Sequence, residues 1–309
     1  METETKAVFP QKDIFYLLNK YSDIVSRIDA EILLSHIFRC ARTGLYTTSH
    51  NADRGIEKLY DSFIKRRLSG EPIQYITGTV EFMGLAFAVN RRVFIPRPET
   101  EILANEVLLS TQPRAKGGRL RILDLCTGCG NIAISLARLI PDTEIVAMDI
   151  SGPALEVAQK NSILHGVDKY ITFLKGDAFQ VLPGSRYQTP KSKDKSLGQG
   201  LLFDKKAKFD IIVCNPPYIK SLEIGFLQKE VRLEPEAALD GGPDGLEFYR
   251  LIADVSPDYL KERGSLFLEI GFGQAQHVVD IFNSRNLFEI HKVKKDFTEI
   301  DRVAWIDLL

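Results

Sequence analysis

The stretch RILDLCTGCGNIAISLARLIPDTEIVAMDI, residues 121–150, decides the fold of this chain. RILDL at 121–125 is a short apolar run that predicts a buried strand, NIAISLARLI at 131–140 predicts a helix, and TEIVAMDI at 143–150 predicts a second strand. A strand, a glycine-rich turn and a helix in this order are typical of an open parallel sheet, in which ligands bind at the carboxyl ends of the strands. We therefore expect a ligand at residues 126–130.

Strands and helices continue to alternate toward the C-terminus. The strands are near-continuous apolar runs, which indicates a parallel α/β sheet covered by helices on both faces. The last two strands follow one another without a helix, so we expect an antiparallel hairpin at one edge of the sheet. Outside the opening stretch, the expected helices are 99–109, 151–166, 245–260 and 274–286, and the expected strands are 170–177, 209–218, 264–272, 288–293 and 302–309.

The N-terminal part predicts a small helical domain at 1–71. Two of its segments have apolar residues at helical spacing, namely Ile28, Ile32, Leu33 and Ile37 in the first and Ile56, Leu59, Phe63 and Ile64 in the second. Residues 72–95 are rich in β-branched and aromatic residues and predict a β-hairpin linker to a main domain at 96–309. Within that domain the polar, Lys-rich stretch 184–208 predicts a mobile surface insertion, with a basic arm for a charged partner as the alternative.

The composition is that of an ordinary globular protein of 309 residues, with 44% hydrophobic and 26% charged residues. A formal net charge of −1 argues against a protein that grips long nucleic acid by bulk charge. Four cysteines in this length fit a reducing compartment better than a disulfide scaffold. The sequence shows no secretory signal and no apolar run of the roughly 20 residues that a membrane span needs. We therefore expect a cytoplasmic protein that acts as a monomer.

The turn CTGCG at 126–130 carries the first functional signal. Gly128 and Gly130 let the backbone approach a ligand without a Cβ in the way, and the helix N-terminus offers unpaired N–H groups. Asp149 ends the next strand, 19 residues after Gly130, where an acid accepts hydrogen bonds from ribose hydroxyls. These residues predict a cofactor that contains adenosine, with a tight turn and a helix N-cap as the alternative. Because Ala133 occupies the third glycine position, the loop fits either NAD or S-adenosylmethionine.

The second signal is Asn215-Pro216-Pro217-Tyr218, which follows the apolar run FDIIVC. Two consecutive prolines cannot continue a sheet ladder, because neither has an N–H, so they predict a rigid turn at the carboxyl edge of the sheet. There the Asn215 side chain and the Pro216 carbonyl offer two acceptors, and Tyr218 offers an aromatic face. A planar amide or exocyclic amine is a poor nucleophile, and two acceptors that take its N–H protons orient its nitrogen toward an electrophile. The motif predicts methyl transfer from the activated sulfonium of S-adenosylmethionine, with a turn without chemistry as the alternative.

Beyond this motif, the chain resembles the release factor glutamine methyltransferase family over nearly its whole length. The strings that carry the resemblance are RRLSGEPIQYITGTVEFMGLAF (66–87), FIPRPETE (94–101), EPEAALDGGPDGLEFYR (234–250) and LEIGFGQ (268–274). The resemblance implies a Rossmann-like, seven-stranded class I methyltransferase sheet with a small N-terminal helical domain that binds substrate. It also implies that the substrate is the glutamine of the GGQ motif in class 1 peptide chain release factors, methylated on its side-chain amide with S-adenosylmethionine.

Carried over by position, the resemblance assigns cofactor binding to Cys126, Thr127, Gly128, Cys129, Gly130, Asp149, Asp177, Ala178, Phe179 and Asn215. It assigns catalysis and the clamp on the substrate amide to Asn215, Pro216, Pro217 and Tyr218. Arg97 and Glu234 are placed at the substrate entrance, with an ion pair or a helix cap as the alternative. The chain departs from the family at Cys126, where glycine is common, and at Ala178, where tryptophan often stacks on adenine, so stacking is lost or passes to Phe179.

Several alternatives stay open at this point. An adenine-amino methyltransferase that acts on DNA or RNA would share the glycine loop, Asp149 and the NPPY motif. It would also need a basic cleft and a target-recognition domain. A non-catalytic binding module and an NAD oxidoreductase are further alternatives. Cys126 and Cys129 are either small loop residues or a redox pair whose oxidation, together with Cys214, would block the cofactor site. We expect no metal, because the five histidines lack ligand spacing, and we expect Trp305 in the core.

Overall fold

The computed structural model describes residues 13–111, 119–177 and 208–309. The chain divides into two compact units, which are Met1–Gly78 with Lys229–Leu233 and Thr79–Gln228 with Glu234–Leu309. Of the insertion expected at 184–208, only its last residue lies within the described part. Its Nζ atom donates a hydrogen bond of 3.0 Å to the carbonyl of Pro257.

The first unit is helical, as its apolar spacing predicts. Its helices are α1 (Ile14–Lys20), α2 (Arg27–Phe38), α3 (Gly44–Thr47), α4 (Arg54–Leu68) and α5 (Ile73–Thr77). Ser26 begins α2 by accepting a hydrogen bond of 3.1 Å from the Asp29 amide. Of the apolar residues at helical spacing in this segment, Ile28 is 57% exposed, whereas Leu33 is fully buried together with the adjacent Leu34. The helix turns Ile28 outward because its core-facing stripe is centred on those leucines.

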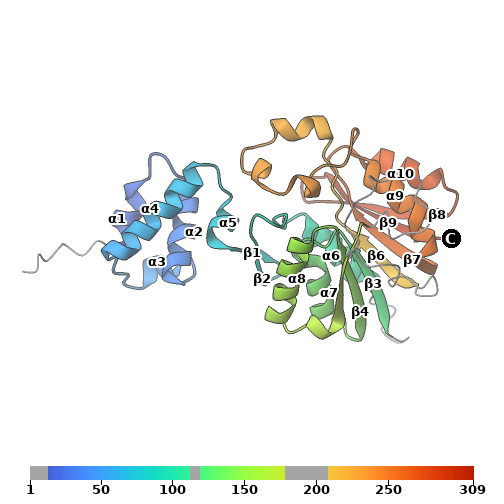
Figure 1. Cartoon of the computed structure of the whole chain (residues 1–309), viewed down its shortest axis with the longest axis horizontal. Coiled ribbons are helices and arrows are strands. Elements are labelled where there is room, and N and C mark those ends of the chain that lie inside the picture. The colour runs from blue at the N-terminus through green and yellow to red at the C-terminus, as the bar shows by residue number, and fades with distance from the viewer. Residues whose placement is uncertain (1–12, 112–118, 178–207) are drawn as a thin grey trace, which may run out of the picture. The chain divides into compact units, whose positions relative to one another are not determined.

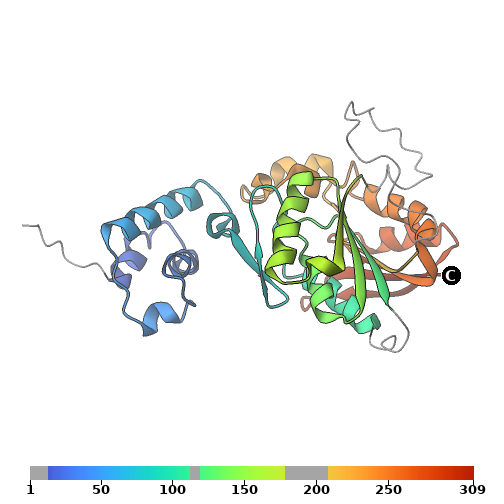
Figure 2. The same cartoon turned by 60° about the horizontal axis from the view of Figure 1, so that its bottom comes forward.

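A β-hairpin opens the second unit. Strands β1 (Thr79–Phe82) and β2 (Leu85–Ala88) pair antiparallel, which confirms a hairpin within the segment predicted to contain one. Helix α8 (Gly152–Leu164) packs against β2 (Figure 2). The buried Asn161 side chain of α8 bonds both backbone groups of Ala88, accepting from its amide at 2.8 Å and donating to its carbonyl at 3.1 Å. The hairpin is therefore fixed to the sheet domain by specific polar contacts.

The main sheet has seven strands in the order β5-β4-β3-β6-β7-β9-β8 (Figure 1). Strand β9 pairs antiparallel with both β7 and β8, whereas the other neighbours are parallel, so the expected antiparallel hairpin at one edge is confirmed. The strands are β3 (Leu120–Leu125), β4 (Thr143–Asp149), β5 (Ile171–Lys175), β6 (Phe209–Cys214), β7 (Leu260–Glu269), β8 (Phe288–Lys295) and β9 (Asp301–Leu308). This order places β3 between β4 and β6.

Helices cover both faces of the sheet, and the strands bury side chains on each face. Ile122 belongs to one core cluster, together with α6 (Thr100–Thr111) and α7 (Asn131–Leu139). Leu123 and Leu125 belong to the other, together with α9 (Glu247–Val255) and α10 (Ala275–Asn283). Alternate residues of one strand therefore serve two cores, which explains the continuous apolar run.

Two predicted boundaries shift near α9. The helix expected to reach residue 260 ends at Val255, because Pro257 lacks the N–H that a longer helix needs. Strand β7 consequently begins at Leu260 rather than at 264. Short 3-10 turns complete the second unit at Asp168–Tyr170, Ser221–Phe226, Glu236–Ala238 and Ser256–Asp258, and Val231–Leu233 forms one in the first. No helix within the described residues is both long and apolar enough to cross a membrane.

Candidate active site

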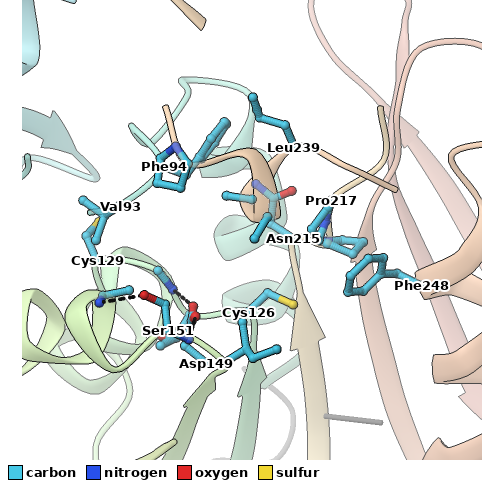
Figure 3. Close-up of a pocket in the computed structure, with 18 of the residues that line it drawn as sticks. Val93, Phe94, Cys126, Cys129, Asp149, Ser151, Asn215, Pro217, Leu239 and Phe248 are labelled. Atoms are coloured by element: carbon cyan, nitrogen blue, oxygen red, sulfur yellow. Dashed lines mark hydrogen bonds between the residues drawn. The ribbon is translucent and has the colours of Figure 1, made fainter. Parts of the chain in front are cut away.

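A cavity of about 470 Å³ lies at the carboxyl edge of the sheet. Figure 3 shows Asp149 and Ser151 on one side of it and Asn215 and Pro217 on another. Its lining is mostly apolar, with a few polar groups, which is the usual composition of a small-molecule site. Its lining includes Phe94 and Thr100, residues 126–129, Asp149 and Asp177, residues 215–219, and Leu239 and Phe248. The structure therefore joins the two signals of the sequence, the glycine loop and the NPPY turn, in one cavity.

The glycine loop connects β3 to α7 with a sharply turned backbone. Gly130 caps α7 at φ 82°, and a Cβ there would lie 2.9 Å from Cδ1 of Ile134, so a larger residue does not fit. Cys126 also has positive φ, at 59°, a conformation that costs a residue with a side chain. Glycine adopts this conformation without that cost, because it has no Cβ, and it therefore suits the position of Cys126. Gly130 shapes the helix start, whereas the other four loop residues line the cavity.

Asp124 holds the glycine loop in place by hydrogen bonds, and the sequence analysis did not identify it. Its Oδ2 atom accepts a hydrogen bond of 2.6 Å from the Thr127 hydroxyl and one of 3.2 Å from the Ala133 amide. The side chain is fully buried in β3. Burial raises the pKa of Asp124 to about 7, although the bonds from Thr127 and Ala133 lower it. Asp124 thus ties the loop to the first turn of α7 from inside the protein.

Asp149 lies at the end of β4, as predicted, and borders the cavity. Its Oδ2 accepts from the Gly128 amide at 2.8 Å and its Oδ1 accepts from the Ser151 amide at 2.8 Å. Burial raises the pKa of Asp149, and these amide bonds oppose the shift. Each carboxylate oxygen has a second lone pair, so the side chain can also accept hydrogen bonds from a ribose.

The adenine side of the predicted cofactor site is only partly described. Asp177 lines the cavity. Ala178 and Phe179 lie outside the described residues, so stacking on adenine stays a prediction. The described lining does include apolar side chains that the sequence analysis did not single out, among them Val93, Leu239 and Phe248.

The NPPY turn leaves β6 next to the glycine loop, because Cys214 pairs with Leu125 in the sheet. The Asn215 Nδ2 atom donates a hydrogen bond of 3.1 Å to the Thr100 hydroxyl. Within the described residues, neither Asn215 Oδ1 nor the Pro216 carbonyl oxygen accepts a hydrogen bond. The two acceptors that the sequence predicts are therefore both available at the cavity.

The backbone of the NPPY turn packs closely against Gly241 and is bonded by Gln274. A Cβ on Gly241 would lie 2.7 Å from Cα of Tyr218 and 2.9 Å from the Pro217 carbonyl, so only glycine fits there. The Tyr218 carbonyl accepts a hydrogen bond of 2.9 Å from Gln274 Nε2. These contacts give a physical role to the strings at 234–250 and 268–274, which surround the turn.

Tyr218 also reaches a buried carboxyl that the sequence analysis did not name. Its hydroxyl donates a hydrogen bond of 3.3 Å to Glu269 Oε1 at the end of β7. Burial raises the pKa of the Tyr218 phenol, and the nearby Glu269 raises it further. Tyr218 is thus linked directly to Glu269, whereas Asn215 bonds Thr100.

Arg97 and Glu234, expected at the substrate entrance, bond each other. The second carboxylate oxygen of Glu234 accepts a hydrogen bond of 2.9 Å from the Ile95 amide. Neither charged side chain lines the cavity, but their neighbours Pro96 and Pro235 do. The ion pair therefore holds the backbone beside two residues that line the cavity. Contact of Arg97 or Glu234 with the substrate stays a prediction.

Cys126 and Cys129 line the cavity, and Cys126 packs against the core cluster that contains the fully buried Cys214. Burial raises the pKa of Cys214 well above its usual range and raises the pKa of Cys129 to about 12. All three are free thiols. Among residues 13–111, 119–177 and 208–309, no group of three histidine, cysteine or acidic side chains could hold a metal ion.

The residues present fit S-adenosylmethionine, because free carboxylate lone pairs, a helix N-terminus and the NPPY acceptors face one cavity. Residues 17–78 match the family described as "PrmC N-terminal domain", and residues 116–256 match the family described as "Methyltransferase domain". Fold and site together define an S-adenosylmethionine-dependent methyltransferase with a class I sheet.

Curated relatives narrow this class. The chain is 37% identical over 292 residues to a release factor glutamine methyltransferase of Thermodesulfovibrio yellowstonii, covering 93% of this chain and 96% of the relative. It is 39% identical over 284 residues to the enzyme of the same name from Geobacter sulfurreducens, covering 90% and 88%. The chain belongs to the release factor glutamine methyltransferase family. It is a protein-glutamine methyltransferase, as the resemblance of its strings predicts.

Proposed function

We propose that the cavity brings S-adenosylmethionine to the glutamine of the GGQ motif in a class 1 peptide chain release factor. In this proposal the glutamine side chain lies at Asn215 and Pro216, and the product carries a methyl group on its amide nitrogen. The observation that supports it most directly is the bond from Asn215 Nδ2 to Thr100, which leaves Oδ1 as an acceptor beside the Pro216 carbonyl, and that carbonyl accepts no hydrogen bond from the described residues.

The two acceptors compensate for the weak nucleophilicity of the substrate amide. An amide nitrogen is weakly nucleophilic because its lone pair is delocalised. Asn215 Oδ1 and the Pro216 carbonyl take one N–H each, which aligns the nitrogen and favours the positive charge that develops on it. No base has to act before the attack, because the methylated nitrogen can lose its proton afterward. Pro217 makes the turn rigid, and the Tyr218 ring provides an aromatic wall.

Cofactor binding is proposed for the opposite side of the cavity. When bound, S-adenosylmethionine supplies a methyl group already activated by its sulfonium. Asp149 accepts from the ribose, Asp177 borders the adenine, and residues 126–130 approach the rest of the molecule with their backbone. Asn215 belongs to both halves of the site, since it borders the loop and holds the amide.

The remaining parts of the chain take supporting roles in this proposal. The helical domain at 1–71, joined by the linker at 72–95 to the methyltransferase domain at 96–309, binds the release factor. Arg97 and Glu234 fix the substrate entrance through their ion pair. We also propose a cytoplasmic location, where release factors act, and a monomer without stable binding to nucleic acid, in line with the net charge of −1.

The test is a methyl-transfer assay with labelled S-adenosylmethionine. A purified class 1 release factor, its variant with alanine in place of the GGQ glutamine, and duplex DNA are offered in parallel. We expect label on the release factor and none on the variant or the DNA. Label on DNA alone would instead support the adenine-amino methyltransferase alternative and would overturn the proposal.

A further inference from the structure

Four large apolar side chains of the second unit stand out by their exposure. Within the described residues, these four are each at least 79% exposed, and no other large apolar side chain exceeds 68%. They are Leu222, Phe226, Phe272 and Phe297. Single exposed apolar residues are ordinary on a protein surface, whereas several of them gathered in one region mark an interaction site.

The sheet topology gathers these four side chains at one edge. The segment with Leu222 and Phe226 follows β6 and the turn with Phe272 follows β7, so both leave the carboxyl edge at which the cavity lies. Strand β9 runs antiparallel to β7, and Val303 near its start pairs with the last residue of β7. The turn with Phe297, which joins β8 to β9, therefore lies at the same edge. From β6 to β8 the edge spans three strand spacings, or about 14 Å.

The first of these segments is continuous with the cavity wall. Ile219 and Asp240 both line the cavity and form a β-bridge with each other. The Ser221 hydroxyl donates a hydrogen bond of 2.6 Å to Asp240 Oδ1. Leu222 is the next residue, and Phe226 ends the 3-10 turn that begins at Ser221. These two apolar side chains therefore stand on backbone that is bonded to the wall of the cavity.

The turns that carry Phe272 and Phe297 are also held by side-chain hydrogen bonds. Gln274 Oε1 accepts from the Gly271 amide at 3.2 Å, beside Phe272. Asp296 precedes Phe297 and accepts hydrogen bonds of 2.8 and 3.1 Å from two backbone amides of its own turn. Apolar side chains on backbone that is already ordered lose less conformational entropy on binding a partner than those on mobile segments. The exposed side chains are thus placed in advance for a partner.

We propose that Leu222, Phe226, Phe272 and Phe297 form a docking surface for the release factor, on which the protein surface around the methylated glutamine packs. This inference rests on the proposed function, in which the cavity receives the glutamine side chain beside the cofactor. A specific protein complex buries on the order of 1,200–2,000 Å², so most of the contact has to lie outside the cavity. Apolar side chains, and aromatic ones above all, are the usual anchors of such contacts.

The position of the surface favours the release factor over a second copy of this chain. The surface lies at the same edge as the cavity, and its first segment shares backbone with the cavity wall. A second copy bound there would compete with a protein substrate for access to the cavity. A substrate protein, in contrast, reaches the surface whenever its glutamine enters.

The first experiment compares the double variant Phe226→Ala/Phe272→Ala with the intact protein. We expect KM for a purified class 1 release factor to rise about 5- to 30-fold, the range for truncated interface anchors, while kcat and the Kd for S-adenosylmethionine change less than about twofold. The Kd for the release factor, measured by calorimetry without cofactor, rises by a similar factor. The control is Leu164→Ala. Leu164 is exposed at the end of α8, which begins after β4 and runs back to the opposite edge, so KM is unchanged.

A matched pair at Phe226 tests the chemistry of the contact. Phe226→Leu keeps an apolar side chain, so KM stays within about threefold of the intact value. Phe226→Gln has a polar side chain of similar length, so KM rises well beyond that limit. Urea unfolding gives the same midpoint for both variants and the intact protein, because exposed side chains contribute little to the stability of the fold. A change in KM at constant stability therefore reports docking.

The outcomes separate this inference from the proposed function. If the intact protein labels the release factor and the double variant keeps both KM and Kd, the proposed function stands and the docking surface is overturned. An equal rise in KM for Leu164→Ala, or for Phe226→Leu and Phe226→Gln alike, also contradicts it. If sedimentation shows that the double variant turns a dimer into a monomer with KM unchanged, the surface joins two copies instead. No label on the release factor from the intact protein would overturn the proposed function, and this inference with it.

Discussion

The Gly128 amide donates a hydrogen bond of 2.8 Å to Asp149 Oδ2, so the acid at the end of β4 holds the glycine loop that follows β3. The second carboxylate oxygen holds the Ser151 amide at the start of α8. Asp149 therefore shapes the loop, and in the proposed function its remaining lone pairs also accept hydrogen bonds from the ribose of the cofactor.

Replacing Asp149 with alanine should weaken cofactor binding more than the loss of one ribose contact. The variant loses charge-assisted hydrogen bonds, each worth about 1.5–3 kcal/mol, and releases Gly128. We expect the Kd for S-adenosylmethionine to rise at least about tenfold, measured by calorimetry. Asp168→Ala, at an exposed position, serves as the control. An unchanged Kd in the Asp149 variant would show that the ribose binds elsewhere.

Replacing Asn215 with alanine should separate chemistry from cofactor binding. The change removes one of two aligned acceptors, and losing one preorganised hydrogen-bonding group of this kind costs about 10²- to 10³-fold in kcat. The Kd for S-adenosylmethionine should stay within about threefold of the intact value. The measurement is labelled methyl transfer to a release factor at saturating cofactor. Full activity in this variant would rule out the amide clamp.

Of Cys126, Cys129 and Cys214, we expect only Cys126 to be sensitive to oxidation. A thiolate is the form that peroxide oxidises, and burial raises the pKa of Cys129 to about 12 and that of Cys214 well above its usual range. We expect peroxide at neutral pH to oxidise Cys126 among these three and to weaken S-adenosylmethionine binding. In Cys126→Gly, which suits the positive φ of this position, binding should not change on peroxide treatment. A falling thiol count with unchanged binding in the intact protein contradicts the prediction.

The sequence predicted the parts of the site that follow local rules. The loop at 126–130 and Asp149 were found because the carboxyl ends of parallel strands meet at one edge, and the NPPY turn was found because two prolines end a strand. The helical pattern in α2 predicted the element correctly, but it did not show that Ile28 would be exposed, because periodicity does not say where the core-facing stripe is centred.

The groups behind the site could not be found in this way. Thr100 lies 115 residues from Asn215 in the chain, and Asn161 lies 73 residues from Ala88, so only the folded sheet brings each pair together. Glu269 looks like an ordinary acid at a strand end. What distinguishes it is its burial and its contacts, which one sequence does not reveal. An acid inside the apolar string LEIGFGQ was the available signal, since acids are rarely buried without a reason.

Glu269 should reduce the stability of the folded protein above neutral pH. Its pKa is raised from 4.5 to about 7 in the folded protein, so the folded state binds this proton more tightly than the unfolded state. Stability from this group is therefore lost as pH rises from about 4.5 to about 7, and the loss is complete above pH 7. Each unit of pKa difference corresponds to about 1.4 kcal/mol, which gives a cost on the order of 3 kcal/mol.

Glu269→Gln removes this cost, because its side chain stays neutral. We expect the variant to match the intact protein in free energy of unfolding near pH 4.5 and to exceed it by up to about 3 kcal/mol at pH 8. Urea unfolding at both pH values measures the difference, with Glu262→Gln as the exposed control. Greater stability of the variant at pH 8 would show that the buried charge costs the fold free energy. If the variant is instead less stable than the intact protein at pH 8, the carboxylate stabilises the folded state. That result would contradict the expected free-energy cost of burying its charge.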